Sequence, residues 1–225
     1  MEHSTTPLIN IHTHTIPNSD EITILNVFPN ENIGVWLPAN LYFSTGIHPW
    51  HLGQWKSLEE RLTNLACNPR VIAVGECGLD TQASSPMEQQ EEVFCQHIAL
   101  SEEYKKPLII HCVKAFNELI GIHKKMKPKM PWIIHGFNAS AEIAKKCLDM
   151  GMMLSFGMFL LNEKSKATNI AKDIPTSVVF LETDESKTTI SDIYNRFSAI
   201  KSIPMETLKA EIAKNFNNCF KSCSF

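Results

Sequence analysis

The sequence lacks the features that define several large classes of protein. Its seven cysteines include no C-x-x-C pair, which argues against a disulfide framework and against a zinc ribbon. No apolar run approaches the roughly 18 residues of a membrane span, so no membrane partner is expected. The N-terminus has no basic region followed by an apolar core, and we therefore expect no signal peptide and a cytoplasmic location.

An excess of one charge is also missing. The chain carries 21 Lys and Arg against 24 Asp and Glu, a net charge of −3, whereas domains that bind nucleic acids are often strongly basic. Local clusters such as Lys124–Lys125 and Lys145–Lys146 are typical of solvated helix ends. The charge balance therefore neither favours nor excludes a substrate that contains phosphate.

No repeat, low-complexity stretch or Pro/Gly-rich linker divides the chain, and 225 residues is a usual length for one α/β barrel. We predict a single domain over residues 1–225. Short apolar runs alternate with helical patterns, which is typical of βαβ units and a mostly parallel sheet. The predicted strands cover residues 8–11, 22–28, 41–47, 71–74, 108–110, 132–134, 152–156 and 178–181.

Eight such strands predict an α/β fold of the (β/α)8 TIM-barrel type. Residues 15–20 alone separate the first two strands, although a parallel crossover usually needs about a dozen residues. We therefore expect a somewhat truncated barrel without its first helix. Ser57 with Glu60 has the spacing of a capping box, and Gly151 is expected to follow the end of a helix. The helical patterns cover residues 57–67, 86–104, 139–151 and 202–220.

Ionisable side chains follow six of the predicted strands, each where the apolar run ends. The carboxyl ends of parallel strands meet at one face of a barrel, where the active sites of barrel enzymes lie. We therefore expect these side chains to share one pocket. They are His12 and His14 after the first strand, His48 after the third, Glu76 after the fourth, His111 after the fifth, His135 after the sixth and Asp184 after the eighth.

His12 and His14 have the spacing that lets one cation bind both, because residues two apart on a strand point to the same face. Taken singly, a histidine at a strand end is more often a structural residue, and a carboxylate there more often caps a helix. Together, buried carboxylates cost too much unless they are paired or bound to metal, and this composition suits a divalent metal. The predicted metal ligands are His12, His14, Glu76, His111, His135 and Asp184.

The other histidines suggest different roles. His97 and His123 lie in helical patterns, where surface or packing roles are expected. His51 follows Trp50 just past the third strand and is a weaker candidate for the pocket.

Seven short motifs resemble those of the TatD-like metal-dependent hydrolases, which belong to the amidohydrolase-type barrels. The motifs occur in the family's order and rough spacing, from about residue 8 to the C-terminal helix. In this chain they read INIHTH, GIHPWHL, VIAVGECGLD, PLIIHC, IIHGF, LSFG and LETD. The resemblance implies a two-metal hydrolase, and family members are described as DNases and 3′-5′ exonucleases.

The resemblance also implies two neighbouring metal sites that share Glu76 as their bridge. Two histidines and one carboxylate would hold the first metal: His12, His14 and Asp184. Two histidines would hold the second: His111 and His135. His48 would lie beside the site and contact substrate, whereas Asp80, in the GLD segment, is a motif residue to which we assign no role.

The expected mechanism follows from general metal chemistry. A divalent metal lowers the pKa of bound water and polarises the phosphoryl oxygen, and a pair about 3.5–4 Å apart steadies both the attacking and the leaving oxygens. Asp184 is the expected acceptor of the water's proton, since a carboxylate at the metal is placed for general-base work, and Glu76 completes the catalytic pair. Mixed nitrogen and oxygen ligands accept Zn, Mn or Mg.

The chain departs from the family pattern in four places. Asn10 stands where relatives usually carry Asp, and Val113, next to Lys114, stands where an Arg is expected. No aromatic residue directly follows the GLD segment, and the loop after LETD is cut to ESKTT. Two of these changes remove groups that could hold phosphate. They concern the choice of substrate, whereas the metal ligands are intact.

Three functions are compatible with the sequence. The first is a divalent-metal-dependent phosphodiesterase, a deoxyribonuclease of the 3′-5′ exonuclease type that acts on DNA or RNA ends. The second is a metal-dependent hydrolase of a small ester, lactone or amide, which the missing Arg and the acidic balance favour modestly. The third, a binding protein with a relict site, is disfavoured by six intact ligands. We expect no obligate protein partner.

Overall fold

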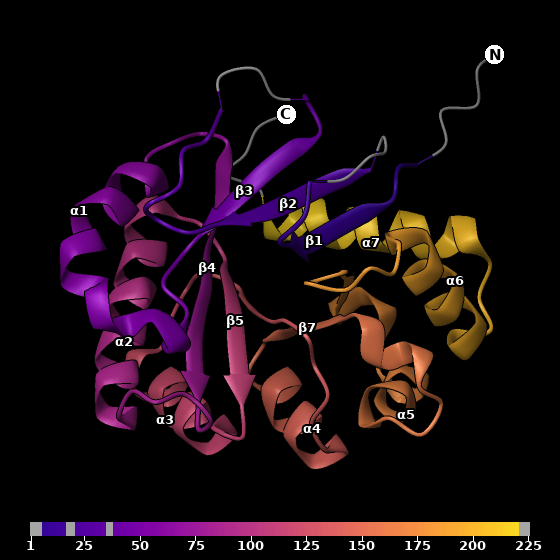
Figure 1. Ribbon diagram of the computed structural model, residues 1–225. Helices are drawn as coiled ribbons and strands as arrows, with labels where there is room; N and C mark the ends of the chain where they lie inside the picture. The colour runs from indigo at the N-terminus through magenta and orange to yellow at the C-terminus, as the bar shows by residue number, and fades with distance from the viewer. Residues whose placement is uncertain (1–5, 17–20, 35–37, 221–225) are drawn as a thin grey trace.

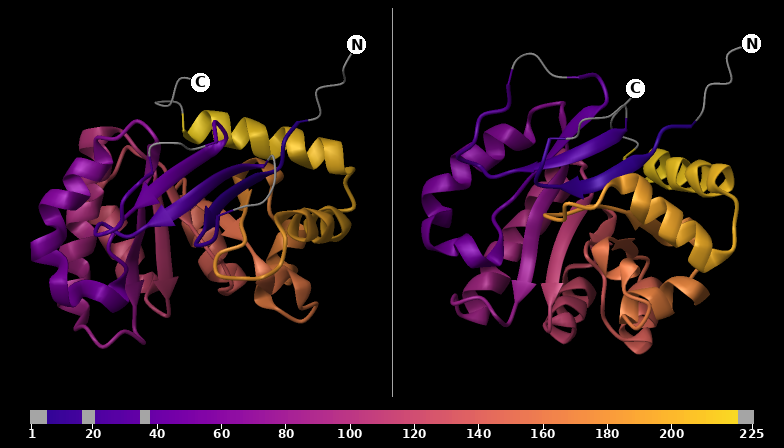
Figure 2. Two further views of the ribbon diagram at one scale, coloured as in Figure 1. Left: turned by 45° about the horizontal axis from the view of Figure 1, so that its top comes forward. Right: turned by 45° about the vertical axis from the view of Figure 1, so that its right-hand side comes forward.

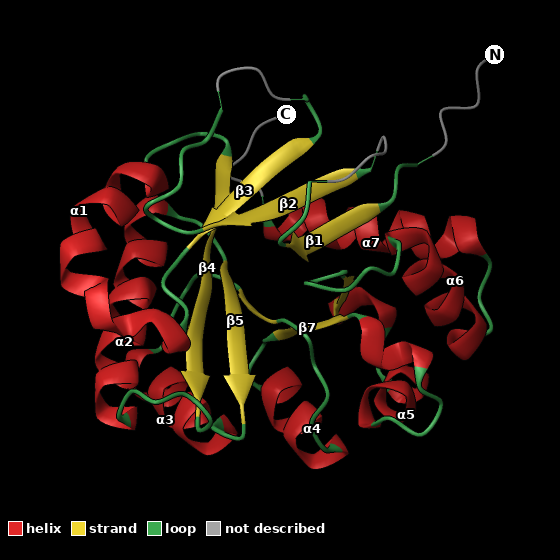
Figure 3. Ribbon diagram, in the orientation of Figure 1, coloured by secondary structure: helices red, strands yellow, loops and turns green. Residues whose placement is uncertain are grey.

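A parallel sheet of eight strands, curled towards a barrel, is the framework of the molecule (Figure 1). The computed structural model describes residues 6–16, 21–34 and 38–220. Each strand pairs with its neighbours in chain order, as Figure 3 also indicates for the strands in view. The strands are β1 (Ile9–Thr13), β2 (Ile22–Val27), β3 (Leu41–Thr45), β4 (Val71–Asp80), β5 (Leu108–Val113), β6 (Trp132–Ile134), β7 (Met153–Phe156) and β8 (Val179–Leu181).

Helices surround the sheet on its outer side (Figure 2). One α-helix follows each strand from β3 to β7, and two follow β8. None of the helices in the described parts of the chain is both long enough and apolar enough to span a membrane. The helices are α1 (Trp55–Ala66), α2 (Met87–Tyr104), α3 (Phe116–Met126), α4 (Ala141–Asp149), α5 (Lys166–Asp173), α6 (Ile190–Lys201) and α7 (Met205–Cys219).

The eight predicted strands are all present, and the barrel fold is confirmed. Strands such as β4, β6 and β8 are buried along their whole length, as continuous apolar runs predict. The four helical patterns also form helices, and α3 contains His123, which was expected to lie in a helix, whereas α5 and α6 lie in segments for which no helix was predicted. The α5 helix has eight residues, too few for a periodic apolar pattern to stand out.

The first helix is absent, as predicted, in the described residues between β1 and β2; residues 17–20 lie outside the described chain. Residues 28–34 and 38–40, between β2 and β3, also form no helix, which the sequence did not predict. Instead, the C-terminal helix α7 packs against β1 and β8 through buried residues such as Leu208, Ile212 and Phe216. Burial of β1, near the start of the chain, therefore depends in part on α7.

The prediction of a capping box at Ser57 is wrong. Ser57 does not cap α1, because the 3₁₀ helix Pro49–Gln54 runs directly into that helix, and the Ser57 hydroxyl donates a hydrogen bond to the Gln54 carbonyl at 2.7 Å. The capping box of this chain lies instead at Thr189 and Asp192, at the start of α6. Gly151 follows the end of α4 with a φ of 79°, as expected for a residue in that place.

His97 is a packing residue, as predicted. It is 1% exposed, its Nε2 accepts the Ile47 backbone N–H at 2.9 Å, and its Nδ1 lies 2.8 Å from the Val93 carbonyl oxygen. Burial lowers the pKa of His97 to about 4, so the ring is neutral near pH 7. The ring therefore ties α2 to the backbone segment that leads into His48. His123 is half-buried against the Trp132 ring, which also agrees with a packing role.

The barrel closes between β1 and β8, and the two ends of this seam differ. At the mouth, Thr13 and Asp184 form a parallel bridge, and the His12 carbonyl accepts the Asp184 N–H at 3.0 Å. At the opposite end, the buried Tyr194 of α6 takes the place of a strand partner. Its hydroxyl accepts the Ile9 N–H at 3.1 Å and donates to the Ile9 carbonyl at 3.2 Å.

Replacing Tyr194 by Phe should lower the free energy of unfolding by about 1–3 kcal/mol, because both backbone groups of Ile9 would lose a buried partner. Urea unfolding followed by circular dichroism measures the change. Tyr104→Phe, at the half-exposed end of α2, is the control and should change this free energy by less than about 0.5 kcal/mol. A Tyr194→Phe variant as stable as the parent would show that the seam does not need the hydroxyl.

Candidate metal centre

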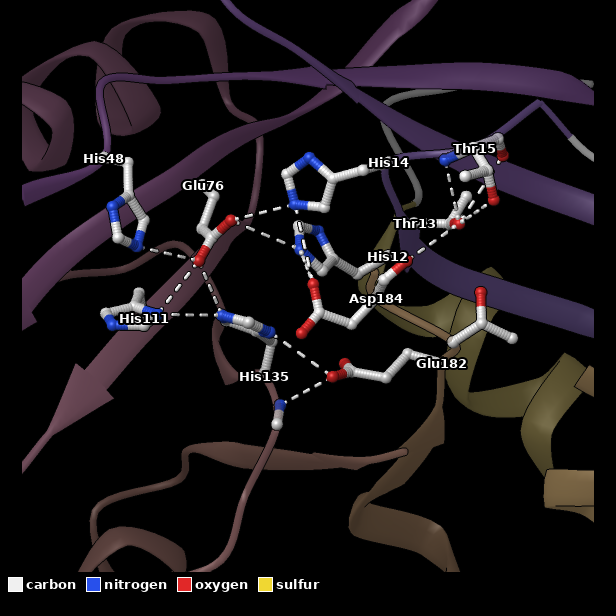
Figure 4. A network of polar contacts seen from close by, with 12 residues as sticks. His12, Thr13, His14, Thr15, His48, Glu76, His111, His135, Glu182 and Asp184 are labelled. Atoms are coloured by element: carbon white, nitrogen blue, oxygen red, sulfur yellow. Dashed lines mark hydrogen bonds and ion pairs between the residues drawn. The ribbon is translucent and has the colours of Figure 1, made fainter. Parts of the chain in front are cut away.

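The predicted side chains converge at the mouth of the barrel, where Figure 4 shows them pointing toward one another. They surround a cavity of about 780 Å³. His12 is fully buried behind the cavity wall, and His51, the weaker candidate, also lines the cavity. The other predicted residues on the wall are His14, His48, Glu76, His111, His135 and Asp184.

Glu76 lies at the centre of the cluster, and its side chain is 7% exposed. Five imidazoles contact its two carboxylate oxygens. Glu76 Oε2 faces Nε2 of two of them, His12 at 3.4 Å and His14 at 3.3 Å. Glu76 Oε1 faces Nε2 of His48 at 3.3 Å, Nδ1 of His111 at 3.0 Å and Nε2 of His135 at 2.8 Å.

Two glycines allow β4 to carry Glu76 into this position. Gly75 and Gly78 have φ of 141° and 145°, values that side chains rarely adopt. A Cβ at Gly75 would collide with the Ile109 carbonyl oxygen, and a Cβ at Gly78 would collide with the His111 carbonyl oxygen. The register between β4 and β5 shifts at this point. The GECG sequence therefore lets two strands approach closely while the carboxylate projects into the mouth.

Asp184 joins the cluster through the seam of the barrel. Its backbone, with φ of 53°, pairs with Thr13. This pairing directs its carboxylate toward His12, in β1, and His14, directly after β1. Asp184 Oδ1 lies 3.6 Å from His12 Nε2 and 3.5 Å from His14 Nε2. Barrel closure thus brings together residues that lie more than 170 positions apart in the chain.

His111 is held from behind by a buried carboxylate. Asp80 is 1% exposed, and its Oδ2 lies 3.1 Å from His111 Nε2, on the side of the ring away from Glu76. The same oxygen accepts the indole N–H of Trp50 at 2.7 Å. Asp80, to which the sequence assigned no role, therefore determines which nitrogen of His111 faces the cluster.

His135 is held in the same way by Glu182, which sequence reasoning missed. Glu182 is fully buried, and its Oε1 lies 3.3 Å from His135 Nδ1 and accepts the Gly136 backbone N–H at 2.7 Å. The residue lies within the LETD motif, two positions before Asp184. The signal that could have found it is this spacing of two, which also relates His12 to His14.

Asn10, which stands where the family resemblance led us to expect Asp, does not support the His12 ring. Its Oδ1 accepts the Thr183 backbone N–H at 3.1 Å, and its Nδ2 donates to the Thr183 hydroxyl at 2.9 Å. Asn10 therefore joins β1 to the segment that carries Asp184. His12 Nδ1 has no hydrogen-bond partner.

The charges of the cluster are strongly coupled. Burial by itself would raise the pKa of Glu76, but the surrounding imidazoles, His135 foremost, hold that pKa well below its usual value. Burial opposes a low pKa of Asp184 as well, yet His12 lowers it to about 2. Burial and His135 would lower the pKa of His12, whereas Asp184 and Glu76 raise it to about 9. The carboxylates are therefore ionised, and protons on His12 and His135, whose pKa values are raised, balance part of their charge when no metal does so.

The donor groups fit a divalent metal. The buried His12 Nε2 makes no hydrogen bond of good geometry but faces carboxylate oxygens of Glu76 at 3.4 Å and Asp184 at 3.6 Å, so a cation between these three donors would satisfy all of them. Mixed imidazole nitrogen and carboxylate oxygen donors suit divalent transition metals. Within the described chain, three groups of residues have ligand atoms all within 4.8 Å of one another: His12, His135 and Asp184; His12, His14 and Glu76; and His48, Glu76 and His111.

Comparison with solved structures supports the fold. The TatD homologue YJJV from Escherichia coli K12 superposes with a TM-score of 0.83 at 18% identity, over 96% of this chain and 99% of that one. A TatD-family hydrolase from Entamoeba histolytica superposes with a TM-score of 0.73 at 17% identity, over 96% and 98% of the two chains. At these identities the likeness concerns the fold alone.

Sequence comparisons identify the family. A protein from Yersinia pseudotuberculosis named 3′-5′ ssDNA/RNA exonuclease TatD is 30% identical over 152 residues, and the Bacillus subtilis uncharacterised metal-dependent hydrolase YabD is 35% identical over 150 residues. These matches cover 65% and 64% of this chain, and 58% of each relative's own length. The model of the TatD-related DNase family matches residues 32–221. The chain therefore belongs to the TatD-related DNase family.

Proposed function

We propose that this chain is a divalent-metal-dependent phosphodiesterase that releases nucleotides from the ends of single-stranded DNA or RNA. The observation that carries the proposal is the buried carboxylate of Glu76, which five imidazoles contact at a barrel mouth. Such a donor set suits a pair of cations that stabilises phosphoryl transfer to water. The relatives named 3′-5′ ssDNA/RNA exonucleases support the choice of substrate and the direction of cleavage.

Two ions, rather than one, fit the distribution of donors around Glu76. Glu76 Oε2 faces His12 and His14, and Glu76 Oε1 faces His111 and His135. One ion would be held by His12, His14 and Asp184, and the other by His111 and His135. Among the three candidate metals, the nitrogen-rich donor set favours Zn over Mn and Mg. When bound, the metals would lower the pKa of a water molecule and polarise the phosphoryl oxygen.

Asp184 is the side chain best placed to accept the proton of the attacking water. Its side chain is 39% exposed toward the cavity, whereas that of Glu76 is 7% exposed. Its pKa of about 2 means that it is ionised at neutral pH, which is the protonation state that a proton acceptor requires. Glu76 would instead keep the two sets of histidines at a fixed separation.

His48 would contact the substrate from the other side of the cavity. Its Nδ1 accepts the Trp50 backbone N–H at 3.2 Å, which leaves Nε2 facing the cluster. Burial lowers the pKa of His48, so that its ring is neutral at neutral pH. Because Nδ1 accepts a hydrogen bond, the neutral ring carries its proton on Nε2 and can donate one hydrogen bond to the reacting group.

A hydrolase of a small ester, lactone or amide is the second candidate, and one observation favours it. In the described residues that line the cavity, no lysine or arginine is present to bind phosphate. Val113 leaves the position of the expected Arg uncharged. If the substrate were a phosphodiester, the metals would have to supply all of the positive charge that it requires, whereas an uncharged ester or amide needs no such charge.

The metal-loaded protein should release nucleotides from single-stranded DNA or short RNA, and EDTA should abolish the release. His111→Ala should lower the rate at least about 100-fold, since it removes a metal-facing imidazole beside Glu76. His123→Ala, which removes a histidine that does not line the cavity, is the matched control and should retain activity.

A panel of chromogenic esters and phosphodiesters, assayed beside the nucleic acids, decides between the candidates. Turnover of esters alone would contradict the proposal in favour of the second candidate. No turnover by a protein that still binds metal would leave a binding protein.

Glu182→Gln should weaken metal binding about tenfold to 100-fold, because the neutral side chain no longer raises the basicity of His135. Competition with a chromogenic chelator measures the metal affinity without reference to catalysis. Glu185→Gln, an exposed carboxylate on the cavity wall, is the matched control and should change the affinity by less than about twofold. Equal affinities of the Glu182→Gln variant and the parent would show that the buried carboxylate does not act through His135.

Metal affinity should rise with pH between about 6.5 and about 9. In the metal-free site the pKa of His12 is raised from 6.5 to about 9, so this ring holds a proton at pH 7.5 that a metal must displace. Isothermal titration calorimetry at pH 7.5, in two buffers of different ionisation enthalpy, measures the number of protons released. Binding heats that are identical in both buffers would refute a protonated His12.

A further inference from the structure

Trp50 is an exposed tryptophan that the structure nevertheless holds in one position. It is 57% exposed and lines the cavity beside the metal centre. Its indole N–H donates to Asp80 Oδ2 at 2.7 Å, and its backbone N–H donates to His48 Nδ1 at 3.2 Å. A large apolar ring that remains open to solvent while its polar atom is anchored provides a contact surface for a ligand.

The anchor of Trp50 is itself rigid. Asp80 Oδ1 accepts the Gln82 backbone N–H at 2.7 Å. The buried side chain of Gln90 accepts the Asp80 N–H at 2.7 Å and donates to the Asp80 carbonyl at 3.0 Å. Because the ring is held before any ligand binds, a contact with its face costs little conformational entropy.

Four rings on the cavity wall extend outward from the metal centre, and together we call them the aromatic wall: His48, Trp50, His51 and Phe28. The His48 ring centroid lies 4.3 Å from that of His111, 5.8 Å from that of Trp50 and 6.0 Å from that of His51. The His51 centroid in turn lies 5.8 Å from that of Phe28. These rings form one continuous series that begins at a metal-facing imidazole.

The far end of this wall is also fixed. The Phe28 backbone N–H donates to Glu31 Oε2 at 2.7 Å, and the Phe28 carbonyl accepts the Glu31 N–H at 2.8 Å. Arg61 of α1 donates from Nε to the Pro29 carbonyl at 3.0 Å. Residues 28–31 after β2 are therefore held in a defined shape at this end of the cavity.

The polar groups of the cavity select the chemistry of the ligand. Besides the rings, the described lining includes the amide side chains of Asn26, Asn30 and Gln54 and the carboxylates of Glu31 and Glu185, but no lysine or arginine. Amides can hydrogen-bond the edge of a heterocycle, and aromatic faces stack on it, whereas a phosphate needs cationic partners. The part of the cavity beyond the metals thus suits a planar, uncharged, heterocyclic group.

We infer that Trp50 is the platform on which the base of the terminal nucleotide stacks while the scissile phosphate lies at the metal centre. The inference rests on the proposed phosphodiesterase function and names the part of the substrate that this chain recognises. Stacking on an aromatic side chain strengthens binding about tenfold to 100-fold per base. The enzyme should therefore discriminate against ends that lack a terminal base.

The test uses a fluorescently labelled single-stranded oligonucleotide and a matched one whose 3′-terminal nucleotide is abasic. Anisotropy titrations in EDTA give the Kd of both without cleavage, and steady-state assays with metal give KM and kcat. The parent should bind the intact end at least about tenfold more tightly than the abasic end. Trp50→Ala should reduce this ratio to less than about twofold, in Kd and in KM, by weakening binding of the intact end alone. Trp50→Phe, which keeps a ring, should retain part of the ratio.

Phe159→Ala is the matched control, because Phe159 is 42% exposed on the 3₁₀ helix that follows β7 but does not line the cavity. This variant should keep the parent's ratio. A Trp50→Ala variant that weakens binding of both ends equally, or of neither, overturns the inference in a protein that cleaves DNA. Binding in EDTA is independent of catalysis. A preference for the intact end that requires Trp50 therefore supports the platform even in a protein that cleaves no phosphodiester. The lack of cleavage would then contradict only the proposed function.

Discussion

A single buried carboxylate, Glu76, determines how the rest of the mouth is built. An ionised carboxylate removed from water costs several kcal/mol unless positive charge or metal compensates it. Five imidazoles from four segments of the barrel lie within 3.4 Å of its oxygens. The pKa values of two of them, His12 and His135, are raised, so these rings carry compensating positive charge when no metal is bound. The strands must therefore curl until their carboxyl ends meet. The two glycines of β4 are needed for the same reason, because they let the neighbouring strand approach the backbone on either side of Glu76.

The histidines are in turn oriented by groups behind them. Asp80 contacts the outer nitrogen of His111, and Glu182 contacts the outer nitrogen of His135, so that each ring directs its other nitrogen toward Glu76. Asp184 reaches the cluster through the pairing that closes the barrel. Fold closure and site assembly are thus one event in this chain, since the backbone bonds that join β1 to β8 also position a carboxylate. The exposed Trp50 is joined to these supporting groups as well, because its indole N–H donates a hydrogen bond to Asp80.

Much of this arrangement could be predicted because apolar runs and the polar residues after them are local patterns. All eight strands and the meeting of seven ionisable residues at the mouth followed from those patterns. Other features depend on contacts between distant segments. The described residues between β2 and β3 form no helix, and α7, which is distant in the sequence, covers β1. Ser57 failed as a cap because a preceding 3₁₀ helix moved the helix start, and Glu182 escaped notice because its partner His135 is 47 positions away.

The sequence by itself determined the class of fold, the order of the strands and the kinds of donor that gather at their ends. The spacing of apolar residues encodes which backbone segments are buried, and parallel strands must then present their carboxyl ends on one side. The tertiary structure alone decided which carboxylate lies at the centre, which nitrogen of each histidine faces it, and that the cavity beyond is walled by rings and amides. These properties are set by the packing of side chains from separate elements, and no local pattern in a single chain records such distances and orientations.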